Sequence, residues 1–185
     1  IYDYFVEPEN VWDITSYDKD TWPDAIFSCT ATNINQGEFS DTLTVLTYMD
    51  YKEVKSWSDS FNTAANPGER SDAYNEFKKK KEEQVLNRLE NRFPGIRECI
   101  LNQHSSTPLT YKDYIGTDDG SLYGIKKDFN SSAASSINSK TKIKNMYLTG
   151  QNIVFHGILG ATISGLLTCM NFIDGDQLIE DIANE

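Results

Sequence analysis

The sequence NMYLTGQNIVFHGILGATISGLLTCMNFI, from Asn145 to Ile173, says most about the fold of this chain. It opens with a short apolar run typical of a strand, passes through a Thr-Gly-Gln-Asn turn, and continues into a segment with the composition of a helix. Small residues gather where that helix begins: Gly157, Gly160, Ala161, Ser164 and Gly165. Because glycine weakens a helix by roughly 1 kcal/mol relative to alanine, their position needs a reason.

Two interpretations account for these small residues. In the first, the helix N-terminus offers unpaired backbone N–H groups and a partial positive charge to the electron-rich part of a ligand. Gly157 and Gly160 would leave space for its approach. In the second, the helix only packs closely on another backbone along a smooth stripe: Ala161, Ser164, Gly165 and Thr168. The side-chain amides of Gln151 and Asn152, which precede the helix, favour a ligand site.

The composition limits the class of protein. With 185 residues, 38% of them hydrophobic, the chain is long enough for one domain with a sizeable core. Its net charge of -11 argues against a nucleic-acid partner, whose phosphates require a basic surface. Cys29, Cys99 and Cys169 match neither a disulfide framework nor zinc-ligand spacing, which favours a reducing, cytoplasmic location.

Upstream, the sequence predicts strands followed by a long helix. Aromatic and β-branched runs over residues 1–6, 24–34 and 41–51 are typical of strands. The mixed character of both faces of the third predicts burial within a sheet. Apolar residues at helical spacing predict a helix over about residues 72–93, with Lys81 filling the one gap in its apolar stripe. We expect an α/β fold in which this helix packs on a mixed, largely antiparallel sheet.

Residues 105–139 are polar and rich in Gly, Tyr and Ser, which predicts a long loop of the kind usually associated with function or mobility. The chain has no Gly-x-Gly pair, so it carries neither a dinucleotide fingerprint nor a P-loop. His104 and His156 are its only histidines, and neither has a second ligand at metal-binding spacing. We therefore expect no metal site.

Two motifs resemble a family of flavoenzymes. NMYLTGQNIVFHGILGATISGLLTC resembles the C-terminal flavin-binding segment of FAD-dependent phytoene desaturases, carotenoid isomerases and all-trans-retinol 13,14-reductases (retinol saturases). STPLTYKDYIGTDDGSLYGIKKDF resembles a second motif of these enzymes, particularly of the retinol saturase-like branch. Together the motifs cover about Ser105 to Phe172. The resemblance implies an FAD-dependent oxidoreductase that acts on a carotenoid or retinoid-like polyene by flavin-mediated hydride transfer.

The resemblance also implies roles for single residues. The turn that approaches the ribityl chain or pyrophosphate of FAD corresponds to Gly150, Gln151 and Asn152. Ile158 and Leu159 match positions whose backbone N–H groups point at the N1/C2=O edge of the flavin, which gains negative charge on reduction. The rest of the expected cofactor site consists of small residues that permit this approach: Gly157, Gly160 and Ala161.

The roles of four other residues stay open. His156 would suit a proton donor for saturation of a C=C bond, where a hydride and a proton must both arrive, or it is a structural turn histidine hydrogen-bonded to the backbone. Three tyrosines either line the substrate cavity or are half-buried aromatics with satisfied hydroxyl groups: Tyr111, Tyr114 and Tyr123.

Enzymes of this family begin with a Rossmann unit whose glycine-rich turn holds the FAD pyrophosphate, and the present sequence contains no such turn. We therefore expect a C-terminal fragment of a two-domain flavoprotein of the FAD/NAD(P)-binding, Rossmann type. Residues 1–139 would belong to the substrate-binding domain, and residues 140–185 would form the last strand and helix of the FAD-binding domain. Alone, the fragment would bind FAD weakly or not at all and catalyse nothing.

The expected partners follow from the same resemblance. They are an apolar polyene substrate and the N-terminal Rossmann part of the same protein, with NAD(P)H as an electron source and a peripheral membrane contact for the full-length enzyme. Oligomer formation stays open. The alternative is a stand-alone, non-catalytic binding or interaction domain that kept the small-residue stripe and lost the chemistry.

Overall fold

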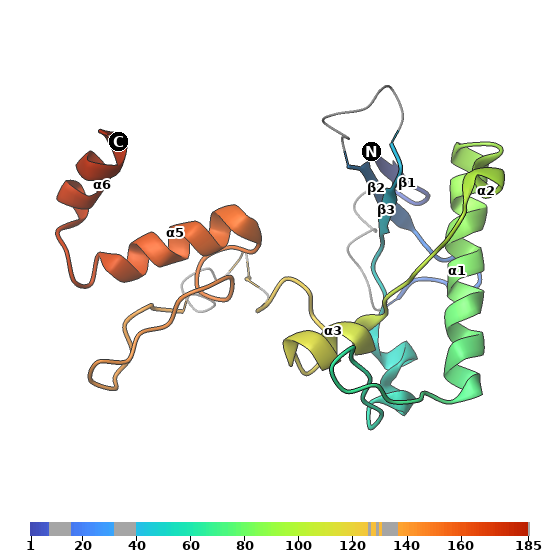
Figure 1. The fold of residues 1–185 in the computed structure, drawn as a ribbon, viewed down its shortest axis with the longest axis horizontal. Helices are drawn as coiled ribbons and strands as arrows, with labels where there is room; N and C mark the ends of the chain where they lie inside the picture. The colour runs from blue at the N-terminus through green and yellow to red at the C-terminus, as the bar shows by residue number, and fades with distance from the viewer. Residues whose placement is uncertain (8–15, 32–39, 126, 129, 131–136, 185) are drawn as a thin grey trace. The chain divides into compact units, whose positions relative to one another are not determined.

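The computed structural model describes residues 1–7, 16–31, 40–125, 127–128, 130 and 137–184 (Figure 1). The chain divides into two compact units, Ile1–Gly120 and Ser121–Glu185. The division falls inside the Gly/Tyr/Ser-rich segment 105–139 rather than at its end, so residues 121–139 belong with the C-terminal part. The assignment of the two parts to a substrate-binding and an FAD-binding domain stays a prediction.

The first unit contains a three-stranded sheet with the order β1-β2-β3. Its strands are β1 (Tyr2–Tyr4), β2 (Ala25–Thr30) and β3 (Leu43–Leu46). Both pairings are antiparallel, so the expected mixed sheet is wrong for the described residues. Parallel neighbours need a long crossover, usually a helix, and the helices described in this unit all follow the last strand. The predicted strand over 24–34 reaches beyond the described residues at its C-terminal end.

Among the described residues, β3 pairs with β2 alone and so lies at the edge of the sheet, whereas the sequence predicted burial within it. Leu43 at its start is 38% exposed. The half-buried Val45 and Leu46 show that only its second half faces the protein. Apolar residues on both faces indicate burial of the side chains, but they do not reveal whether a further strand pairs with the backbone.

The predicted long helix is confirmed as α1 (Asp72–Arg92). Ser71 caps it, since its side chain accepts a hydrogen bond from the Tyr74 backbone N–H. Two shorter helices follow, α2 (Ile96–Cys99) and α3 (Pro108–Ile115), and two 3₁₀ turns precede it, η2 (Tyr51–Glu53) and η3 (Lys55–Trp57). The buried core of the unit joins α1, α3 and the two 3₁₀ turns through Val54, Tyr74 and Leu109.

α1 also contacts the sheet at β1, and the sequence predicted such packing of the helix on the sheet. Near its C-terminus the Arg92 Nε lies 3.0 Å from Asp3 Oδ1, and the Arg88 guanidinium lies 4.3 Å from the centre of the Phe5 ring. These contacts join the helix to β1 and to the residues just after it. The helix therefore spans the unit from the 3₁₀ turns to the sheet (Figure 1).

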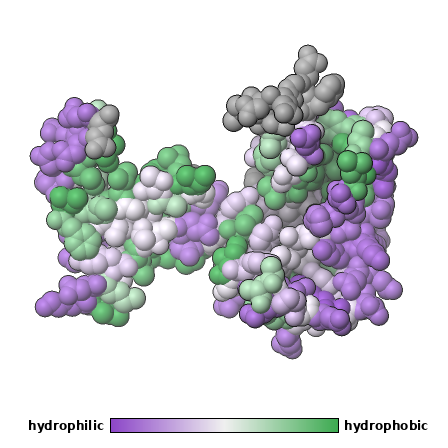
Figure 2. Space-filling view, viewed as in Figure 1, coloured by the Kyte–Doolittle hydropathy of each residue, from purple (hydrophilic) through white to green (hydrophobic). Residues whose placement is uncertain are grey.

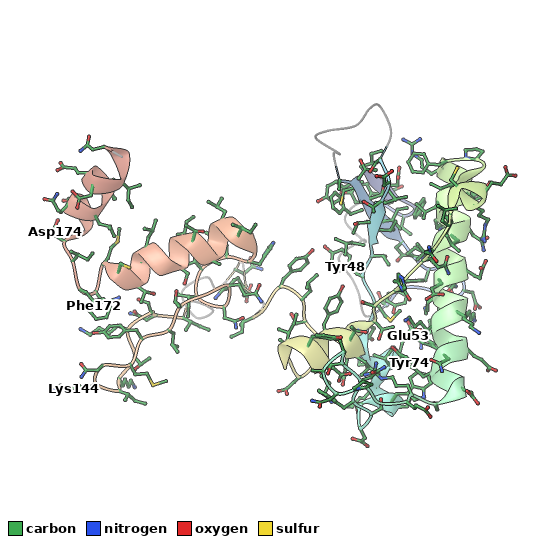
Figure 3. The ribbon with its side chains drawn as sticks, viewed as in Figure 1. Tyr48, Glu53, Tyr74, Lys144, Phe172 and Asp174 are labelled. Atoms are coloured by element: carbon green, nitrogen blue, oxygen red, sulfur yellow. The ribbon has the colours of Figure 1, made fainter. Side chains whose placement is uncertain are left out.

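A buried ion pair occupies the gap in the apolar stripe of α1. The Lys81 Nζ lies 3.1 Å from Glu53 Oε2, and both side chains are less than a tenth exposed. The Tyr17 hydroxyl donates to the same carboxylate, and the Trp22 ring lies 4.3 Å from the lysine Nζ. Figure 3 labels Glu53 of this pair. Burial lowers the pKa of Lys81, whereas burial and the hydrogen bond to Glu53 raise the pKa of Tyr17.

The described residues of the second unit form the helices α5 (Gly157–Cys169) and α6 (Gly175–Ala183). The predicted strand before α5 is reduced to one bridge between Lys140 and Tyr147, so that prediction is wrong for the described residues. A tight turn separates the two bridge residues, and the Thr141 hydroxyl donates to the Met146 carbonyl across it. The described residues of this unit provide no neighbouring strand to extend the pairing.

The C-terminal segment, which is rich in acidic residues, forms the short helix α6. Asp174 caps α6, because its carboxylate accepts hydrogen bonds from the Asp176 and Gln177 backbone N–H groups. Among the described residues, no helix is both long and apolar enough to span a bilayer.

Candidate functional site

The N-terminus of α5 is open, as the ligand interpretation requires. His156 precedes the helix in an extended conformation, and its side chain makes no capping hydrogen bond. Gly157 has a φ of +81°, and no atom outside its neighbours lies within 4 Å of the position that a Cβ would take. The side chains of Ile158 and Leu159 are 90% and 73% exposed. The first backbone N–H groups of the helix therefore have no capping side chain.

The space beside Gly160, in contrast, is filled by the chain itself. A Cβ on this buried residue would lie 2.0 Å from the carbonyl oxygen of Phe155 and 2.4 Å from its carbonyl carbon. A glycine is required here so that α5 can fold back on the segment leading into it. The two interpretations of the small residues thus apply to different positions: Gly160 serves packing, and Gly157 leaves open space.

Two members of the small-residue stripe, Ser164 and Thr168, contact residues 148–150. Ser164 is fully buried, and its Oγ accepts a 2.8 Å hydrogen bond from the Gly150 backbone N–H. One turn later, the Thr168 hydroxyl donates to the Leu148 carbonyl at 3.2 Å. Gly150 has a φ of +110°, which favours glycine at this turn. Its N–H group is engaged by the chain and is not free for a cofactor.

The amides of Gln151 and Asn152 bind a loop from the other sequence motif. The Asn152 Oδ1 accepts a 2.9 Å hydrogen bond from the Ile125 backbone N–H, and the Gln151 Nε2 donates to the Leu122 carbonyl at 3.5 Å. The two motifs, widely separated in the sequence, are thereby joined. A cofactor that used these amides would compete with the chain's own backbone.

The structure brings together two of the predicted site residues, His156 and Tyr123. Their ring centres are 4.6 Å apart, with 44° between the ring planes. Tyr111 and Tyr114 lie in the first unit, on α3. The Tyr114 hydroxyl accepts a 2.7 Å hydrogen bond from the Ala64 backbone N–H, and Tyr111 is half-buried. Tyr114 is 60% exposed, so it is not the half-buried aromatic of the second alternative, and a role in lining a substrate cavity stays a prediction for both residues.

Apolar side chains surround the open end of α5. Phe155 is 63% exposed and lies next to His156 in the sequence, and Ile158 and Leu159 are still more exposed. Ala161 is also exposed. Figure 2 shows hydrophobic surface over the second unit. Exposed apolar groups next to backbone donors suit a ligand that has a large apolar or aromatic body and a polar edge.

Sequence reasoning missed a set of buried charges in the first unit. Besides the Lys81–Glu53 pair, Arg70 and Asp113 form an ion pair whose side chains are 6% and 2% exposed. The gap at Lys81 was a usable signal, because a charge inside an apolar stripe requires a buried partner. Arg70 and Asp113 gave no such signal. The part of the chain that the structure describes holds no cluster of three or more potential metal ligands.

The chain is similar to all-trans-retinol 13,14-reductases of several organisms. It is 31% identical to the Danio rerio protein over 135 residues, which cover 71% of this chain and 21% of the relative. The Rattus norvegicus protein is 28% identical over 144 residues, which cover 76% of this chain and 23% of the relative. The Homo sapiens protein is 27% identical over 146 residues, which cover 77% of this chain and 23% of the relative. No protein-family model matches the chain, and no solved structure matches it significantly.

These similarities confirm the relationship to the retinol saturase-like family that the two motifs predicted. The chain spans about a fifth of the length of the curated relatives it matches.

Proposed function

We propose that this chain, whose sequence relates it to the retinol saturase-like family, forms part of an FAD-dependent oxidoreductase that acts on a retinoid-like polyene. The observation that carries the proposal is the similarity to all-trans-retinol 13,14-reductases over 71–77% of the chain. The open, apolar end of α5 supports it, because this is the segment that resembles the flavin-contacting helix of the family. The rest of the catalytic apparatus would come from residues outside this sequence.

The residues at the α5 N-terminus fit one edge of a flavin. Gly157 leaves the backbone uncovered, and the N–H groups of Ile158 and Leu159 would donate to the flavin N1/C2=O edge. The helix dipole favours negative charge at that position. When bound in its reduced form, FAD would supply the hydride for saturation of a C=C bond. Gly150 and Asn152 would support this end of the helix through their internal hydrogen bonds rather than by binding the cofactor directly.

His156 is the proton donor in this proposal. It lies at the mouth of α5 and carries an imidazole that makes no capping hydrogen bond to the helix. Saturation of a C=C bond needs a proton as well as a hydride, and an imidazolium group can donate that proton. The Tyr123 ring packs against the imidazole of this exposed residue. The electron source for the whole enzyme would be NAD(P)H, and its location cytoplasmic with a peripheral membrane contact.

Flavin binding tests the proposal in protein expressed from the complete reading frame. We expect visible flavin absorption bands and release of FAD on denaturation, whereas the isolated 185-residue chain should bind FAD weakly or not at all. Gly157→Val should reduce flavin content, because valine at a φ of +81° distorts the helix entry and covers the backbone.

Gly165→Ala is the matched control, because no atom outside the helix backbone lies within 4 Å of the added methyl group. It should retain the flavin. A complete, folded protein that stays colourless when FAD is added would contradict the proposal and favour a non-catalytic binding domain.

A further inference from the structure

The loop that carries Tyr123 is fastened to the turn before α5. The Asn152 side chain accepts a hydrogen bond from the Ile125 backbone N–H at 2.9 Å, and its backbone carbonyl accepts one from the Lys127 Nζ at 2.7 Å. The Gln151 amide adds a longer contact of 3.5 Å to the Leu122 carbonyl. Loop residues on both sides of Tyr123 are therefore held by Gln151 and Asn152.

Gly124 makes this attachment close. Its φ is +78°, and a Cβ at this position would lie 2.2 Å from the Asn152 Oδ1 and 3.2 Å from its Cγ. The loop backbone therefore approaches the asparagine side chain more closely than any other residue type would allow. The absence of a side chain at Gly124 leaves room for the Asn152 Oδ1, and this close approach determines where the loop crosses the turn.

The attachment determines the position of Tyr123, the residue directly before Gly124. The Tyr123 ring contacts the His156 ring at a centroid distance of 4.6 Å. His156 makes no capping hydrogen bond that would orient its ring relative to α5. The contact with Tyr123 thus restricts the rotation of the imidazole, and Asn152 restricts Tyr123.

We propose that Asn152 is a positioning residue: it holds the loop of residues 122–125 so that Tyr123 packs against His156 and orients the imidazole at the mouth of α5. The contribution of this orientation to catalysis rests on the proposed function, but the attachment itself is a property of this chain alone. The sequence resemblance assigned Asn152 to the cofactor, whereas the geometry points to a partner within the chain.

Nuclear magnetic resonance of the histidine ring protons tests the attachment in the 185-residue chain without flavin or substrate. The chain has two histidines, so His104 in the first unit is an internal reference. The Tyr123 ring current should displace the His156 ring protons upfield, and Tyr123→Leu measures the full displacement. We expect Asn152→Ala and Gly124→Ala to lose most of that displacement.

Asn152→Asp is the conservative variant, because a carboxylate oxygen can accept the same hydrogen bond from the Ile125 N–H. It should retain the displacement. The proposal is overturned if Asn152→Ala keeps the wild-type shift, or if Asn152→Asp loses as much as Asn152→Ala. If Asn152→Ala unfolds the second unit, the other two variants give the answer. Retention of the shift in Asn152→Asp and its loss in Gly124→Ala support the proposal, and the reverse result overturns it. Since no flavin is involved, failure here is distinguishable from failure of the proposed function.

Discussion

Gly160→Ala is expected to destabilise the second unit by about 1–3 kcal/mol, the usual cost of inserting a methyl group where there is no space. The added Cβ would lie 2.0 Å from the Phe155 carbonyl oxygen, and that atom belongs to the backbone and cannot rotate away. α5 would have to shift from the segment that precedes it. Urea unfolding followed by far-ultraviolet circular dichroism measures the loss.

Gly165→Ala provides the control for this prediction. It lies in the same helix with open space around it, so alanine should stabilise the helix by about 1 kcal/mol. The three tryptophans lie within the first 120 residues, so their fluorescence reports on the first unit and should not change in either variant. Equal stabilities of the two alanine variants would show that the contact between Gly160 and Phe155 is not required.

Lys81→Met is expected to cost about 3–5 kcal/mol of the free energy of unfolding, the typical effect of removing one partner of a buried ion pair. The Glu53 carboxylate, 5% exposed in its side chain, would keep only the Tyr17 hydroxyl as a partner at this site. Chemical denaturation followed by tryptophan fluorescence measures the change, since Trp22 contacts the Lys81 Nζ.

The double variant Lys81→Met/Glu53→Gln is the control, because it removes the stranded charge as well. It should recover most of the stability lost in Lys81→Met. A single variant as stable as the wild type would mean that the pair is not buried in solution. A double variant no more stable than the single one would show that loss of side-chain packing, not an unpaired charge, causes the effect.

The pH dependence of stability gives a second readout of this pair. Burial lowers the pKa of Lys81 from 10.5 in the folded state, so the unfolded state binds more protons between the lowered pKa and 10.5. The contribution of Lys81 to the free energy of unfolding therefore rises with pH in that window. Tyr17 acts in the opposite direction above pH 10, because its folded-state pKa is raised. The stability difference between wild type and Lys81→Met should thus widen with pH up to about 10.

Elements specified by local sequence were predicted correctly, and those that depend on remote partners were not. The spacing of apolar residues and the Ser71 cap are local, so α1 was found within a residue of its ends. The pairing of β3 depends on strands elsewhere, and its apolar residues could not reveal that it forms an edge. The short apolar run before α5 formed only a bridge, because the described part of the second unit offers it no strand partner.

In the candidate site, too, the features that depend on local sequence were predicted and those that depend on how the chain folds back were not. The motif located the α5 N-terminus and its small residues, because glycines at a helix start are a local signal. It could not distinguish Gly157, which faces open space, from Gly160, which faces Phe155, since that difference depends on how the chain folds back. Nor could it show that Asn152 binds a loop near residue 125, which is far away in the sequence.

Conversion of all-trans-retinol by protein from the complete reading frame tests the proposed polyene oxidoreductase activity. With reduced FAD present and oxygen excluded, we expect a product that has gained two hydrogen atoms across one C=C bond and absorbs at a shorter wavelength, because its conjugation is reduced. Liquid chromatography with absorption and mass detection identifies it. Retinol recovered unchanged from a protein that holds reduced FAD, alongside other polyenes that also remain unchanged, would contradict the assignment as a polyene oxidoreductase.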